Sequence, residues 1–154
     1  MGYRISVFKQ YKGQGLIEVI ISLALLVGGI IGALTLATIT IRAGTESRER
    51  IQAALLAQEG IEIVKNNRDT NWIKKAQGEN INWDDNLLNT DNFPNIGSLS
   101  GGNCGSGFEK FTRNINIENL SNDKKKITCT VSWTDASGSH DVKAIDYITN
   151  WQKD

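Results

Sequence analysis

The sequence contains very few of the residues on which enzyme and metal chemistry most often depend. Its 154 residues include one histidine, one proline and two cysteines. Cys104 and Cys129 are too few and too far apart in sequence for a zinc site. We expect His140, beside a turn at Gly138, to be solvated. Because Gly-x-Ser-x-Gly, Cys-x-x-Cys and phosphate-loop motifs are also absent, we expect neither enzyme activity nor a cofactor.

The sequence also lacks net charge, since Lys plus Arg and Asp plus Glu both total 17. The two signs are unevenly distributed, however. Residues 1–13 contain Arg4, Lys9 and Lys12 but no acid, which leaves 14 basic against 17 acidic residues in the remainder. A mildly acidic remainder is typical of a solvated extracellular domain, and it does not indicate nucleic-acid binding.

The strongest positive feature is a long apolar run. No charged residue occurs between Val19 and Ile41, a stretch of 23 residues. As a helix at about 1.5 Å per residue it covers about 34 Å, enough for a hydrocarbon core of about 30 Å. Because the positive residues precede the run, the positive-inside rule predicts a cytoplasmic N-terminus and places residues 42–154 outside the cell.

Two simpler interpretations of this run are a cleaved secretory signal and a plain signal anchor. A secretory signal has a shorter apolar core and a small-x-small cleavage site, for which Thr35-Leu36-Ala37 is a candidate. The run is too long for that class and has Glu18 at its edge. Neither interpretation explains a carboxylate where the chain enters the bilayer.

The residues around Glu18 read Lys12-Gly13-Gln14-Gly15-Leu16-Ile17-Glu18-Val19. This stretch resembles the class III signal of type IV prepilins and type II secretion pseudopilins. The resemblance implies that prepilin peptidase cleaves after Gly13 and that Gln14, where phenylalanine is usual, becomes the N-methylated first residue. A glycine before the cut leaves no Cβ to obstruct the protease. Glu18 then takes the fifth mature position, where the family keeps a glutamate.

The resemblance implies a structural subunit of a type IV pilus or a related secretion or uptake filament. Its partners would be other pilin subunits, prepilin peptidase, the cytoplasmic membrane and the inner-membrane assembly platform. Because a carboxylate in a bilayer costs a few kcal/mol, we expect Glu18 to act in assembly by pairing with another subunit's N-terminal amine. The alternative is a membrane-tethered extracellular binding module that does not polymerise.

The fold implied by the resemblance is the α+β pilin fold, one long helix packed on a small antiparallel sheet. After the leader at 1–13, we expect a helix with a transmembrane half at 14–42 and an amphipathic half at 43–66. Its predicted inner face contains Ile51, Ala54, Ala57, Ile61 and Val64. Gly28 and Gly32 form a small-xxx-small pair that either permits close helix packing or, with Gly29, loosens the helix.

Residues 67–107 are predicted to form a connecting loop, in which Trp72 and Trp83 cap the core. The glycine-rich part, 97–107, is expected to lack regular structure. Asp84, Asp85 and Asp91 are candidate calcium ligands, but their spacing differs from that of a calcium loop, and solvated acids are the simpler interpretation. Glu46, Arg48, Glu49 and Arg50 are likewise expected to form a solvated charged face.

Alternating residues within 108–154 predict an antiparallel meander of about three strands. The predicted inward positions include Phe111, Ile115 and Ile117 in the first strand and Ile127, Cys129, Val131 and Trp133 in the second. The third strand, 142–151, loses its alternation near Ile145, which suggests a bulge. A Cys104–Cys129 disulfide is expected, because the glycine-rich loop can fold across the face on which Cys129 lies.

Four further segments resemble a minor pilin or a pilus-modification subunit. They are Ala57-Gln58-Glu59-Gly60-Ile61-Glu62, Arg68-Asp69 with Trp72, Val131-Ser132-Trp133, and Ile148-Thr149-Asn150-Trp151. They favour a minor subunit over a major one.

Overall fold

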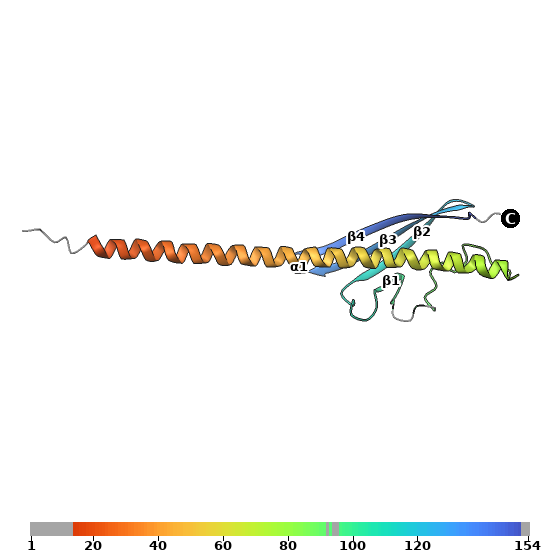
Figure 1. Cartoon of the computed structure of the whole chain (residues 1–154), viewed down its shortest axis with the longest axis horizontal. Helices are drawn as coiled ribbons and strands as arrows, with labels where there is room; N and C mark the ends of the chain where they lie inside the picture. The colour runs from red at the N-terminus through yellow and green to blue at the C-terminus, as the bar shows by residue number, and fades with distance from the viewer. Residues whose placement is uncertain (1–13, 92, 94–95, 152–154) are drawn as a thin grey trace, which may run out of the picture. The chain divides into compact units, whose positions relative to one another are not determined.

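The computed structural model describes residues 14–91, 93 and 96–151. Its elements are helix α1, Gln14–Ala76, and strands β1, Ser100–Asn103, β2, Thr112–Ser121, β3, Lys124–Asp135, and β4, Gly138–Thr149 (Figure 1). The predicted α+β class is confirmed, because a long N-terminal helix packs on an antiparallel sheet. The chain divides into two compact units, one up to Glu46 and one from Ser47 onward, and each is described separately.

The first unit contains a helical segment that is long and apolar enough to cross a membrane, and none of its most apolar 18-residue window is buried. Its threonine hydroxyls are satisfied within the helix, each donating to the carbonyl oxygen four residues earlier at 2.9–3.1 Å. The donors are Thr35, Thr38, Thr40 and Thr45. These local bonds let hydroxyl groups occur in an apolar helix without exposing an unpaired donor.

Helix α1 continues to Ala76, ten residues beyond its predicted end, so residues 67–76 are helix and not loop. Asn67 and Asn71 are buried there, and each side-chain amide donates to two carbonyl oxygens of the following loop. The four acceptors, at 2.6–3.3 Å, belong to Trp83, Asp85, Leu87 and Asn89. Asparagines four apart share a helix face, and these tertiary bonds outweigh their weak helix propensity.

The sheet has the strand order β1-β2-β3-β4, with every neighbouring pair antiparallel. Strands β3 and β4 pair without interruption from Lys124↔Thr149 to Asp135↔Gly138, so the predicted bulge near Ile145 is wrong. Apolar alternation fails there because Asp146 takes a partly buried position, where it pairs with Lys65 of α1 at 2.7 Å. The irregularity therefore lies in side-chain chemistry and not in the backbone.

The fourth strand, β1, comes from the glycine-rich segment for which the sequence predicts no regular structure. It pairs with β2 through a register shift between Ser100 and Gly102, and Gly101 has a positive φ of 77°, which glycine adopts without strain. Leu99, just before the strand, is buried. Backbone pairing at a sheet edge requires no apolar alternation, so this strand has little sequence signal.

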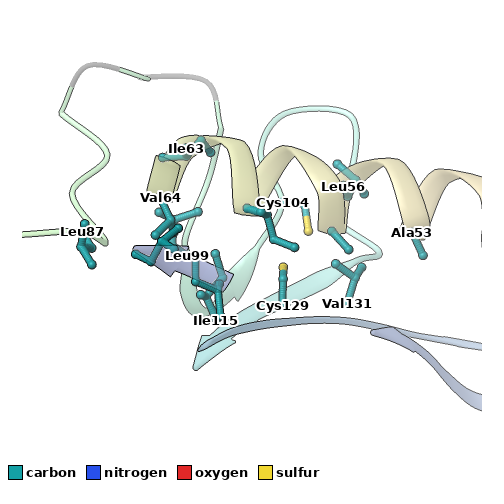
Figure 2. Close-up of a cluster of buried hydrophobic side chains, with 14 of the residues drawn as sticks. Ala53, Leu56, Ile63, Val64, Leu87, Leu99, Cys104, Ile115, Cys129 and Val131 are labelled. Atoms are coloured by element: carbon teal, nitrogen blue, oxygen red, sulfur yellow. The ribbon is translucent and has the colours of Figure 1, made fainter. Parts of the chain in front are cut away.

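The core of the second unit lies between α1 and the inner face of the sheet (Figure 2). Trp72 and Trp83 are buried, as predicted. The inner face of α1 differs from prediction at its start, because Ile51 is exposed and Ala54 only half-buried. Burial begins at Ala53, where packing partners first cover the helix.

Candidate functional site

Glu18 lies one helical turn after Gln14, at the N-terminal end of α1, with its side chain exposed. Residues four apart on a helix share a face and are separated by about 6 Å along its axis. Gly13, the other residue of the predicted cleavage site, lies outside the described residues. The arrangement therefore places one carboxylate close to the backbone nitrogen that cleavage after residue 13 would free.

Three glycines lie in the apolar part of α1 without neighbouring side chains around them. A Cβ built at Gly28, Gly29 or Gly32 has no atom within 4 Å other than its own chain neighbours and the local helix backbone. Packing within this chain therefore does not require these glycines. Small residues on an uncovered helix face permit close approach of another helix.

The second unit contains a fully buried arginine, Arg113 of β2. Its guanidinium donates to the carbonyl oxygens of Leu56 (3.1 Å), Ser98 (3.3 Å) and Ile96 (2.6 Å). It also forms an ion pair with Glu59 at 3.0 Å. One side chain thus joins α1, β2 and the segment before β1. The sequence reasoning missed it, although Arg113 shares the inward strand phase of Phe111 and Ile115.

Gly60 makes space for this arginine. A Cβ there would lie 3.0 Å from Cδ of Arg113, 3.0 Å from Sγ of Cys129 and 3.1 Å from Cδ1 of Ile115. These separations are shorter than ordinary van der Waals contact. The Glu59-Gly60 pair, noted in the sequence for its resemblance alone, thus supplies the anion for Arg113 and the room for its side chain.

Cys104 and Cys129 are free thiols in the structure, so the predicted disulfide is not formed. Both are buried, and their side chains point toward one another between the segment after β1 and strand β3 (Figure 2). Burial raises the pKa of both thiols, that of Cys129 to about 11. A thiol that stays protonated is a poor nucleophile, because the reactive species is the thiolate.

The three aspartates considered as candidate calcium ligands do not converge. Asp84 pairs with Lys125 at 2.8 Å, whereas Asp85 accepts the backbone N–H of Asn82 at 2.8 Å. Asp91 accepts a side-chain N–H of Asn89 at 3.1 Å. Within the described residues no three His, Cys, Asp or Glu side chains lie close enough to share a metal ion.

Two residues expected in solvent have specific partners. Glu49 is largely buried and pairs with Lys110.

His140 stacks on Trp133, with ring centroids 5.3 Å apart. Its Nε2 lies 3.1 Å from Oδ1 of Asp135 and 3.0 Å from Oγ of Ser137.

The contacts of His140 with Asp135 and Ser137 do not form a catalytic triad. A relay needs a different partner on each imidazole nitrogen, whereas Asp135 and Ser137 both lie near the same nitrogen of His140. Hydrogen bonds from Ser137 above all, then from His140, lower the pKa of the Asp135 carboxyl. The cluster therefore acts to hold the β3–β4 turn.

A second cluster joins the end of α1 to the end of β4. Trp72 and Trp151 meet edge to face, with centroids 4.6 Å apart, and the Arg68 guanidinium lies 4.7 Å from the Trp72 ring centroid. Trp72 Nε1 donates to Oδ1 of Asn150 at 3.3 Å. Arg68 pairs with Asp69 at 2.8 Å. We call these five residues the aromatic clasp, and all five occur in segments that the sequence singled out by resemblance.

Comparison with protein-family models, with curated proteins and with solved structures gave no match to this chain.

Proposed function

We propose that this chain is a filament subunit of the type IV pilin class. In this proposal residues 14–42 anchor it in the cytoplasmic membrane, prepilin peptidase removes 1–13, and the second unit is the extracytoplasmic head. The observation that carries the proposal is the uncovered apolar surface from Val19 to Ile41, with a single carboxylate at its start. A plain tether has no need of a carboxylate there.

Glu18 acts in this proposal through charge pairing in a medium of low dielectric. Cleavage after Gly13 gives Gln14 a positively charged amine. In lipid an unpaired carboxylate is costly, whereas attraction between opposite charges is strong. Glu18 of an incoming subunit therefore pairs with the amine of a docked subunit and fixes the axial position of an otherwise uniform apolar helix. Gly28 and Gly32 allow the helices to approach closely.

The decisive experiment replaces Glu18 by Gln, which keeps the side-chain size and removes the charge. We expect protein that is cleaved normally, accumulates in the membrane and is depleted from sheared filaments. Glu62→Gln, an exposed carboxylate of the head half of α1, is the matched control and should assemble normally. Normal incorporation of the cleaved Glu18 variant would contradict the assembly role. A block in cleavage would instead assign Glu18 to protease recognition.

Processing is tested separately by mass spectrometry of the N-terminal peptide. We expect N-methylated Gln14 in the native chain and retention of 1–13 in Gly13→Val, because a branched side chain obstructs the protease. An intact Met1 in the native chain would support the tethered binding module. Normal cleavage of Gly13→Val after residue 13 would refute the argument from backbone access.

A further inference from the structure

The aromatic clasp borders a groove of about 370 Å³, lined by Arg68, Asp69, Trp72, Ile73, Ala76 and Trp151. Two of the lining residues, Ile73 and Trp151, are large apolar side chains exposed to solvent. The volume falls within the range of small-molecule sites, which combine apolar walls with a few polar groups. We propose that this groove binds a neutral pyranose ring, as found in an oligosaccharide or at the end of a glycan.

The exposed indole of Trp151 is held in place. Trp151 is 67% exposed, whereas Trp72, Trp83 and Trp133 are all buried. The preceding residue, Asn150, is fixed twice, by its backbone N–H to the Asp123 carbonyl at 2.9 Å and by its side chain to Trp72. The indole therefore needs little ordering when a ligand binds, and that lowers the entropic cost of binding.

The charges beside the groove favour a ligand without net charge. Arg68 directs Nε and one terminal nitrogen to Oδ1 of Asp69, both at 2.8 Å. These two groups neutralise each other, so the described residues that line the groove offer no unpaired charge with which to select an ionic ligand. They still present N–H donors and carboxylate acceptors of the kind that bind hydroxyl groups.

A pyranose matches both kinds of surface. Its axial C–H groups form an apolar face that carries slight positive charge, and an indole ring presents a face of slight negative charge. Its hydroxyls lie around the edge of the ring, where they can meet Arg68 and Asp69. This inference is independent of polymerisation, since every residue involved lies in the second unit.

The test is a titration of the full chain in a detergent without a sugar headgroup, such as lauryldimethylamine oxide, because maltoside detergents would compete. The probes are cellobiose, lactose, maltose and diacetylchitobiose. Since Trp151 is the exposed indole, bound sugar should protect tryptophan fluorescence from acrylamide quenching in a saturable way for at least one probe.

Two variants locate the site, with affinities measured by isothermal titration calorimetry because Trp151→Ala removes the exposed fluorescent indole. Trp151→Ala and Asp69→Asn should each weaken binding about tenfold or more, a change of about 1.4 kcal/mol. Tyr147→Ala removes another exposed aromatic, on β4, and should bind normally, with all three folds checked by circular dichroism. The proposal is overturned if no probe protects the native chain, or if Trp151→Ala retains full affinity. Either result leaves the filament proposal intact.

Discussion

The two parts of helix α1 have the same backbone conformation but opposite environments. Before Glu46 its large apolar side chains are exposed, and a Cβ added at any of its glycines would meet nothing within 4 Å. After Ser47 the helix buries Ala53, Ala57 and Val64 completely, and a Cβ added at Gly60 would press against three side chains. The same residue type therefore has a different role in each part. In the first part glycine lies on an uncovered helix face, and in the second Gly60 leaves room for neighbouring core side chains.

The largest expected effect follows from removing Arg113. Arg113→Ala leaves a cavity and deprives three carbonyl groups of a donor, so we expect the head to lose about 3–5 kcal/mol of unfolding free energy. Urea unfolding of the detergent-solubilised chain measures this. Arg48→Ala, at an exposed arginine of α1, should change stability by less than about 0.5 kcal/mol. Equal effects of the two variants would remove the contrast between covered and uncovered positions.

Glycine substitutions compare covered and uncovered positions directly. Gly60→Ala forces a Cβ against Arg113 and Cys129, so we expect a loss of about 1–3 kcal/mol. Gly44→Ala adds a Cβ that meets nothing within 4 Å, so it should be neutral or stabilise by up to about 1 kcal/mol, the helix-propensity difference. The same urea titration measures both variants. A Gly60→Ala variant more stable than the native chain would show that the surrounding side chains move easily to admit the added Cβ.

Alkaline pH should destabilise the head through Cys129. Burial raises the pKa of this thiol to about 11, whereas the pKa of a thiol in the unfolded chain is about 8.5. Its contribution is thus fully present below about pH 8.5 and is lost as pH rises toward about 11, by roughly 1–3 kcal/mol. Cys129→Ala should flatten this part of the stability profile, leaving the residual slope to other groups such as Lys65. An unchanged slope would contradict the assignment.

The smallest expected effect is at the Lys65–Asp146 pair, which is partly exposed. A hydrogen bond from Lys65 is the main cause that lowers the pKa of the Asp146 carboxyl. The stabilisation is therefore present above about pH 4, the unfolded value, and is lost as pH falls below it. Asp146→Asn should cost at most about 1 kcal/mol at neutral pH. Asp141→Asn, in the more exposed pair with Lys143, should cost nothing measurable.

The sequence predicted the elements whose signal is periodic. The charge-free run from Val19 to Ile41, the alternation of β3 and the α+β class all follow from spacing and burial preference. Strand β1, the bonds of Asn67 and Asn71, and the regular pairing of β4 beside Asp146 had no such signal. Each depends on polar groups whose partners are distant in sequence, so a local pattern cannot identify them.

The resemblance segments show most clearly what was local and what was tertiary. The sequence alone singled out Glu59-Gly60, Arg68-Asp69 with Trp72, and Asn150-Trp151 by their resemblance. It also determined which segment is long and apolar enough to cross a bilayer. Only the folded chain brought Arg113 to Glu59 and Trp151 to Trp72, and it left both cysteines as buried thiols. The reason is physical: helix formation and membrane insertion depend on neighbouring residues, whereas a buried charge or an indole pair depends on which distant groups the packed core brings together.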